Sequence, residues 1–190
     1  MHLAINSSGR RRIVTSSQDK TIRIWDYHTS MLEGTLVGHD GAVNSVACWG
    51  SVIVSGSDDT TVRIWNANTG DLKHELRGHK GPVNAVAIAS LNRELLVASA
   101  SSDQKVLLWD DESGKLRHTS RGHKSKATSV TFFRRSETLI YVASGSSNGI
   151  ILIWDARTGK LMHTLSGHSG EVTSLVSFGR NLASGSVDGT

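Results

Sequence analysis

The stretch "GHKGPVNAVAIASLNRELLVASASSDQKVLLWD", residues 78–110, decides the fold because both of its ends recur along the chain. A Gly-His pair opens the stretch, a Trp-Asp pair closes it, and another Gly-His pair follows at position 122. Gly-His pairs begin at positions 38, 78, 122 and 167, with steps of 40, 44 and 45 residues. Self-similarity at such a period indicates one structural unit that is used several times.

Tryptophan keeps the same phase as the Gly-His pairs. It stands at positions 25, 65, 109 and 154, where it ends the related blocks "TSSQDKTIRIW", "SGSDDTTVRIW", "SASSDQKVLLW" and "SGSSNGIILIW". Asp follows three of these tryptophans, and Asn66 follows the second. Two independent motifs in one phase indicate about four copies of the unit and the beginning of a fifth.

Each unit has the local pattern of β-strands. Stretches such as "VIVSGS" and "TVRIW" are short and rich in Val and Ile, and "DLKHELRG" alternates apolar with polar residues. Between them, "SDDT" and "NANTGD" are typical turn sequences. We therefore expect four strands per unit. Strands that are apolar on both sides fit small sheets sandwiched between two others.

These motifs resemble those of the WD-repeat (WD40) β-propeller family. The resemblance implies an all-β fold, a β-propeller built from four-stranded antiparallel WD-repeat blades, with four blades plus an incomplete fifth. We predict a single propeller region over residues 1–190, with blades at about 1–37, 38–77, 78–121 and 122–166 and a partial blade at 167–190. The last unit stops inside a turn and no Gly-His pair precedes the first, so we expect a fragment of a longer propeller.

The resemblance also implies one hydrogen-bonded set per blade. Each set joins the His before the first strand, a Ser or Thr in the second, the Asp of the tight turn and the Trp of the third. The implied sets are Thr15, Asp19 and Trp25; His39, Ser55, Asp59 and Trp65; His79, Ser99, Asp103 and Trp109; and His123, Ser144 and Trp154. Asn148 stands where the fourth set should have Asp, so we expect that set to be weaker.

We predict no catalytic, cofactor-binding or metal-binding residue. Ser, His and Asp recur in several equivalent sets, and recurrence favours a structural role because an enzyme needs one site. "TGK" at 158–160 lacks the glycines of a phosphate-binding loop, and "HELRGH" at 74–79 does not have the spacing of the helical zinc motif. His74, His118 and His163 share one position in the repeat, which again favours a structural role.

The chain has one cysteine, Cys48, which cannot form an internal disulfide and which fits a reducing compartment. No apolar run reaches the length of a membrane-spanning helix, and the N-terminus does not have the pattern of a signal peptide. These features predict a cytoplasmic or nuclear protein with no membrane partner.

Charged residues are predicted to divide between the two faces of the propeller. On one face, hairpins between first and second strands should carry a basic set, offset only by Glu94 and Glu137. This set is Arg10, Arg11, Arg12, Arg93, Arg134, Arg135 and Arg180. The opposite face is the commonest docking surface in the family, so the resemblance implies that its loop residues bind partners. They are Asp40, Asp58, Lys80, Lys124, Lys126 and Glu171.

Two functions remain open. Rigid blades that present loops suit a non-enzymatic protein-interaction scaffold or adaptor in a multisubunit complex, with other proteins or peptides as partners. The alternative is an RNA-associated or ribonucleoprotein subunit that uses the arginine face for phosphate contacts. Aromatic residues make up only 5% of the chain and four of five tryptophans belong to the repeats. Few rings are then left to stack on bases, which favours the scaffold.

Finer resemblances leave the complex unassigned. The inserts "SLNREL" and "RRSETL" resemble those of the propeller subunit of the tRNA-modifying Elongator complex. "VIVSGSDDTTVRIWN" equally resembles the substrate-receptor propellers of ubiquitin ligases. Open blade edges also allow self-association, because unpaired strands can pair with another copy.

Overall fold

The computed structural model describes residues 2–5, 11–92, 94–136 and 139–190. Within these ranges the chain forms eighteen strands and no helix. The strands make four four-stranded sheets and one two-stranded sheet, and neighbouring strands are antiparallel and consecutive in the chain. The all-β propeller architecture, with four complete blades and a partial fifth, is thereby confirmed.

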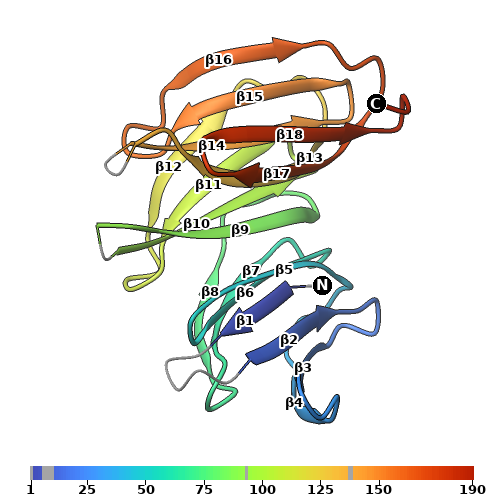
Figure 1. The fold of residues 1–190 in the computed structure, drawn as a ribbon, viewed down its shortest axis with the longest axis vertical. Helices are drawn as coiled ribbons and strands as arrows, with labels where there is room; N and C mark the ends of the chain where they lie inside the picture. The colour runs from blue at the N-terminus through green and yellow to red at the C-terminus, as the bar shows by residue number, and fades with distance from the viewer. Residues whose placement is uncertain (1, 6–10, 93, 137–138) are drawn as a thin grey trace.

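The five sheets follow one another in chain order, from the blue N-terminal sheet at the bottom of Figure 1 to the orange and red C-terminal sheets at the top. The strands of the first two sheets are β1 (His2–Ile5), β2 (Arg11–Ser16), β3 (Ile22–Asp26), β4 (Leu32–Leu36), β5 (Val43–Trp49), β6 (Val52–Ser57), β7 (Val62–Asn66) and β8 (Leu72–Leu76). Those of the third and fourth are β9 (Val83–Leu91), β10 (Glu94–Ser101), β11 (Lys105–Asp110), β12 (Leu116–Arg121), β13 (Ala127–Arg134), β14 (Ile140–Ser146), β15 (Ile150–Asp155) and β16 (Leu161–Ser166). The fifth contains β17 (Val172–Phe178) and β18 (Asn181–Ser186).

The turn that follows the second strand is built alike in every sheet. One residue of each turn has a positive φ, and these residues are Lys20, Thr60, Gln104, Gly149 and Gly189. For a β-branched residue such as Thr60 this conformation is costly. The Asp that precedes it offsets the cost, since Asp59 accepts hydrogen bonds from both the backbone N–H (2.9 Å) and the hydroxyl (2.7 Å) of Thr61.

The hydrophobic core lies between the sheets rather than inside any one of them. Val14 and Ile24 of the first sheet pack with Ile53 and Trp65 of the second in one buried cluster. Similar clusters join the second sheet to the third, the third to the fourth and the fourth to the fifth. Each blade therefore needs its neighbour in order to bury its apolar face, as in other repeat architectures.

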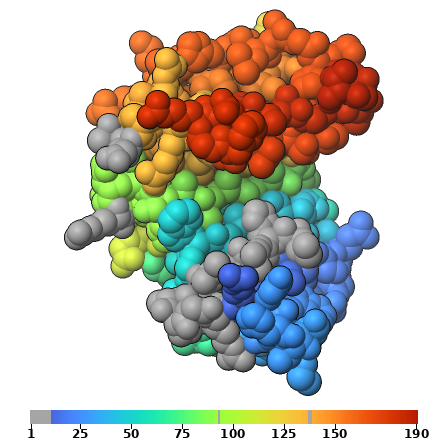
Figure 2. All heavy atoms as spheres, viewed as in Figure 1, coloured from blue at the N-terminus to red at the C-terminus, as the bar shows by residue number. Residues whose placement is uncertain are grey.

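Burial falls off at the C-terminal end of the stack. All residues of β14 are buried, whereas all residues of β16 are exposed and none of β18 is buried. Figure 2 shows the red C-terminal residues on the molecular surface, in a band across the upper part of the view. Nowhere in the described ranges is there a helix with the length and apolar character that crossing a bilayer would require.

Candidate functional site

In the second sheet, a continuous chain of hydrogen bonds joins a Trp, a Ser, a His and an Asp side chain. Trp65 Nε1 donates to Ser55 Oγ (2.9 Å), and His39 Nε2 lies 2.8 Å from the same oxygen. His39 Nδ1 lies 2.7 Å from Asp59 Oδ2. These contacts are all satisfied if the Ser55 hydroxyl donates to Nε2 and the Nδ1–H donates to the carboxylate, so we assign a neutral imidazole with the proton on Nδ1.

The charge states of this pair follow from its surroundings. Burial lowers the pKa of His39, although the hydrogen bond to Asp59 acts in the opposite direction. Burial alone would raise the pKa of Asp59, but hydrogen bonds from Thr61, His39 and the backbone of Asp40 outweigh it and hold that pKa far below its usual range. A neutral His beside an ionised Asp is therefore the stable state at neutral pH.

The third sheet repeats the arrangement with its own residues. Trp109 Nε1 donates to Ser99 Oγ (2.9 Å), which lies 2.8 Å from His79 Nε2. His79 Nδ1 lies 3.1 Å from Asp103 Oδ2. Burial lowers the pKa of His79, against the opposing charge of Asp103. The structure therefore brings together all four residues of both the second and the third implied set.

The first set is only partly assembled. Trp25 Nε1 donates to Thr15 Oγ1 at 3.0 Å. Asp19 is exposed, and its carboxylate instead accepts from the Thr21 hydroxyl (2.6 Å) and pairs with Arg23 (2.7 Å). Asp19 thus stabilises its own turn without entering the Trp25 network.

The fourth set has an orphaned atom at the position where Asn148 replaces Asp. His123 Nε2 lies 2.7 Å from Ser144 Oγ, and Trp154 Nε1 donates to the same oxygen (2.9 Å). His123 Nδ1, however, is buried, and no described residue forms a hydrogen bond with it. Asn148 Oδ1 accepts only from the Ile150 N–H, at 3.4 Å. With no carboxylate to oppose it, burial lowers the pKa of His123 to about 4.

A fifth set is present that the sequence interpretation left out. His168 Nε2 lies 2.8 Å from Ser184 Oγ, and His168 Nδ1 lies 3.0 Å from Asp188 Oδ2. The signal was visible in the sequence, because a Gly-His pair at 167 precedes "SGSVDGT" at the usual spacing. Residues 167–190 contain no tryptophan, the residue that marks the other four sets.

The turn Asp also fixes the loop that precedes the first strand of its blade. The backbone N–H of Asp40 donates to Asp59 Oδ2 (3.0 Å), and that of Lys80 donates to Asp103 Oδ2 (3.0 Å). Ser169 N–H does the same with Asp188 Oδ2 (2.8 Å). The buried network therefore holds the exposed loops in place.

We expect Asp59→Ala to lower the free energy of unfolding by about 1–3 kcal/mol, because it leaves buried His39 Nδ1 and the Asp40 N–H without their acceptor. Chemical denaturation at pH 7 measures this loss. Asp58→Ala is a matched control, since Asp58 is exposed and accepts from the Asn44 side chain (2.7 Å). Equal stabilities of the two variants would contradict the structural role of Asp59.

The six predicted docking residues lie on loops of the second to fifth blades. Their side chains are exposed, except for the half-buried Glu171, and none forms an ion pair with another described residue. The loops and turns that carry them are joined within each blade: Ser147 N–H donates to Lys126 O (3.0 Å) and Val187 N–H to Glu171 O (3.0 Å). One end of the stacked sheets thus presents six charged side chains on hydrogen-bonded loops.

The predicted arginine face needs a correction at Arg12. Arg11 and Arg12 lie within β2 rather than in a hairpin. Arg12 pairs with Glu33 (2.5 Å) and donates to Ala67 O (3.1 Å) and to Asn68 Oδ1 (2.9 Å). Because its guanidinium ties the first blade to the second, Arg12 is not a free cation of that face.

The other members of the arginine set have different surroundings. Arg11 lies over the ring of Tyr27, 5.9 Å from its centroid. Glu94 is paired with Arg117 (2.7 Å). Arg10, Arg93 and Glu137 lie outside the described residues. Arg134, Arg135 and Arg180 are exposed and line one pocket together.

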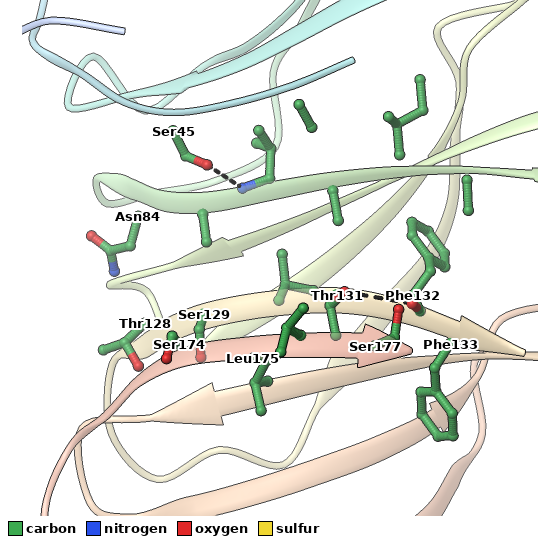
Figure 3. A pocket seen from close by; sticks show the side chains of 18 of the residues that line it. Ser45, Asn84, Thr128, Ser129, Thr131, Phe132, Phe133, Ser174, Leu175 and Ser177 are labelled. Carbon is green, nitrogen blue, oxygen red and sulfur yellow. Dashed lines mark hydrogen bonds between the residues drawn. The ribbon is translucent and has the colours of Figure 1, made fainter. Parts of the chain in front are cut away.

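The first strands of blades two to five line a cavity of about 620 Å³ (Figure 3). Equivalent polar residues bridge these strands, since Asn44 donates to Val83 O (3.1 Å), Asn84 to Ala127 O (2.8 Å) and Thr128 to Val172 O (2.6 Å). Figure 3 shows the hydroxyls of Ser174 and Ser177 and the ring of Phe133 along its lower side. Trp49, 48% exposed, also lines this cavity.

The histidines of the outer strands connect consecutive blades. His74 Nε2 lies 3.0 Å from Glu112 O, and His118 Nε2 lies 2.8 Å from Arg157 O, both on the hairpin of the next blade. The rings pack so closely on Gly114 and Gly159 that a Cβ at either position would lie within 3 Å of them. Both glycines also have positive φ, which L-residues with side chains rarely adopt.

In the part of the chain that the structure describes, no three His, Cys, Asp or Glu side chains are grouped so that they could hold a metal ion. The repeated His–Asp pairs form hydrogen bonds to Ser and to backbone groups.

Comparisons with known proteins agree with this geometry. The pattern of the family described as "WD domain, G-beta repeat" matches residues 1–26, 30–66, 70–110, 114–155 and 159–190. Among solved structures, the computationally designed Ika8 protein is similar with a TM-score of 0.80 and 31% identity, over 94% of this chain and 54% of that one. The designed Ika4 protein is similar with a TM-score of 0.70 and 32% identity, over 82% of this chain and 91% of that one.

One curated relative shares a short segment. The Lissencephaly-1 homolog of Caenorhabditis briggsae is 51% identical over 35 residues, which is 18% of this chain and 9% of that protein. The match thus spans a small part of the relative, and the chain spans about half of Ika8.

Proposed function

Because the chain belongs to the WD40 family of G-beta repeat proteins, we propose that it acts as a non-enzymatic scaffold whose loop face docks partner proteins in a multisubunit complex. Proteins of this family in general bind other proteins and do so without catalysis. The observation that carries the proposal is the row of six charged residues, five of them exposed, on loops of blades two to five. The buried His–Asp pairs hold these loops in place in the second, third and fifth blades. Ordered loops bind with a smaller entropic cost than mobile ones.

The sign of the charge on this loop face differs between blades, so a charged partner should bind in one preferred orientation. The second blade carries Asp40 and Asp58, the third Lys80, the fourth Lys124 and Lys126, and the fifth the half-buried Glu171. A partner with basic residues against the second blade and acidic residues against the third and fourth would match the exposed charges. Charge complementarity of this kind sets specificity and association rate more than total affinity.

Charge reversal tests the docking face. We expect Asp40→Lys with Asp58→Lys, and separately Lys124→Glu with Lys126→Glu, to reduce the recovery of specific partners at least tenfold in quantitative affinity purification. Lys115→Glu is the control, because Lys115 is exposed on the hairpin before β12 and belongs to neither face set. Partner profiles identical among all variants would contradict docking through these loops.

Self-association through the exposed β16 and the edge of β18 is a further partner proposal. Unpaired strands present rows of N–H and C=O groups that can extend a neighbouring sheet. Light scattering of the chain at increasing concentration tests it, and a monomeric mass at every concentration would reject it.

A further inference from the structure

A second charged site lies between the fourth and fifth blades, where two adjacent hairpins meet. Its pocket, of about 200 Å³, is lined by Arg134, Arg135, Ser136, Gly179 and Arg180. Arg134 ends β13 and the next two residues follow directly, while Gly179 and Arg180 connect β17 to β18. Three arginines from two blades thus line one small cavity.

Among the described residues, no carboxylate forms an ion pair with Arg134, Arg135 or Arg180. Arg134 Nη2 donates to the backbone carbonyl of Ser90 in the preceding blade. This contact orients the guanidinium but uses only one of its N–H donors, so most of them remain free.

The described residues of both connections carry backbone hydrogen bonds. Phe178 pairs with Asn181, so Gly179 and Arg180 form a two-residue hairpin turn, in which Gly179 has a φ of +58°. A glycine with positive φ at the first central position is typical of turns that fit the twist of the flanking strands. In the other hairpin, the Arg135 N–H donates to Leu139 O (3.0 Å). Arg135 and Arg180 are therefore presented from short, hydrogen-bonded connections.

We propose that this pocket binds the phosphate group of a phosphorylated side chain on a partner protein. The inference rests on the proposed scaffold function and adds a second contact, between two blades and away from the loop face. Arginine presents planar pairs of N–H donors that match phosphate oxygens in bidentate fashion. A phosphoserine carries a charge of about −1.5 to −2 at pH 7, which three nearby guanidinium groups can balance.

The distribution of charge favours a phosphorylated peptide over nucleic acid. A single-stranded nucleic acid requires a positive groove that follows several phosphates, together with aromatic platforms for its bases. In this protein Arg12 already forms an ion pair with Glu33, and Glu94 forms one with Arg117. Among the described arginines of the predicted basic set, Arg134, Arg135 and Arg180 form one compact group at one junction between blades, which suits a single dianionic group.

Fluorescence anisotropy with defined probes tests the pocket. The probes are a labelled Gly/Ala peptide with one phosphoserine, the same peptide without phosphate, and a labelled single-stranded RNA octamer. We expect the protein to bind the phosphopeptide at least tenfold more tightly than its unmodified twin. Arg135→Ser with Arg180→Ser should remove that preference, and inorganic phosphate should compete in the unmodified protein.

Two further variants separate geometry from net charge. Lys115→Ser with Arg121→Ser removes the same two charges from exposed positions outside the pocket and should leave phosphopeptide affinity unchanged. Arg135→Lys with Arg180→Lys keeps the charge but not the bidentate donors, so its affinity should fall between those of the wild type and the Ser variant. Circular dichroism verifies that each variant is folded.

Each negative result has a distinct meaning. Equal affinity for the two peptides would overturn the proposal, and so would an RNA affinity that exceeds that for the phosphopeptide and is lost in the Arg135/Arg180 variant. The second outcome would instead support the RNA-associated alternative. Loss of partners on charge reversal of the loop face is measured independently, so the scaffold function can stand when this pocket fails.

Discussion

Trp109→Ala is expected to lower the free energy of unfolding by about 3–5 kcal/mol, the usual cost of removing a fully buried large aromatic side chain. Trp109 is 2% exposed and belongs to the cluster that joins the second and third blades. Its ring is so close to the backbone of Gly78 that a Cβ there would lie 2.8 Å from it. The substitution also leaves the Ser99 hydroxyl without the indole donor.

Trp49 provides the matched control for this prediction. Trp49→Ala also removes an indole, but Trp49 is 48% exposed and lies in none of the buried clusters. Surface substitutions of this kind usually change stability by no more than about 0.5 kcal/mol. Urea denaturation of both variants measures the difference, and equal destabilisation would contradict the assignment of Trp109 to the core.

The loss of stability in Trp109→Ala should be greatest in the blades that contact Trp109. In repeat proteins stability is approximately a sum over units and their interfaces, so the damage concentrates where the cluster is broken. Hydrogen exchange should therefore speed up most in β6–β7 and β10–β11, which contribute to that cluster. Uniform acceleration over all blades would show that the chain unfolds as one cooperative unit.

The fold could be predicted because the repeat supplies the same information several times. Trp65, Trp109 and Trp154 recur at one position, and each donates to a Ser ten residues earlier, a separation that is constant within the blade. Strands and turns inside a blade depend on local residues, and these are visible in the sequence. Averaging over the units makes even short apolar segments unambiguous.

The contacts between blades were less accessible to sequence reasoning. The equivalence of His74 and His118 was visible, but their packing on Gly114 and Gly159 depends on how consecutive sheets stack. Arg12 was predicted to lie in the hairpin between the first and second strands. The strand in fact extends over it, and its partner Glu33 lies on β4 of the same sheet. Long-range neighbours of this kind are not determined by residue type alone.

Acidification is expected to destabilise the protein well before its carboxylates titrate, because buried histidines must gain a proton. His123 has a pKa of about 4 when folded, below the 6.5 of an exposed imidazole. Between these values the unfolded chain binds more protons, so stability is present above pH 6.5 and is lost as the pH falls. From pH 6.5 to 5 His123 alone contributes a loss of about 2 kcal/mol, and His39 and His79, whose pKa values burial also lowers, add to it.

Asn148→Asp should reduce this sensitivity and stabilise the protein at pH 7 by about 1–3 kcal/mol, since it gives the orphaned Nδ1 of His123 a charged acceptor. The fifth blade is the template, because Asp188 followed by Gly189 lies 3.0 Å from His168 Nδ1, and Asn148 is likewise followed by glycine. The new carboxylate raises the pKa of His123 toward the unfolded value, so less stability is lost on acidification.

The reverse change, Asp103→Asn, removes the carboxylate acceptor of the buried histidine in the third blade. It removes the carboxylate from His79 and the acceptor from the Lys80 N–H. We therefore expect lower stability at pH 7 and a steeper fall between pH 6.5 and 5. Thermal melting of the wild type and both variants at pH 7, 6 and 5 measures the slopes. If Asn148→Asp and Asp103→Asn shift the melting temperature in the same direction, the turn position does not act through its histidine.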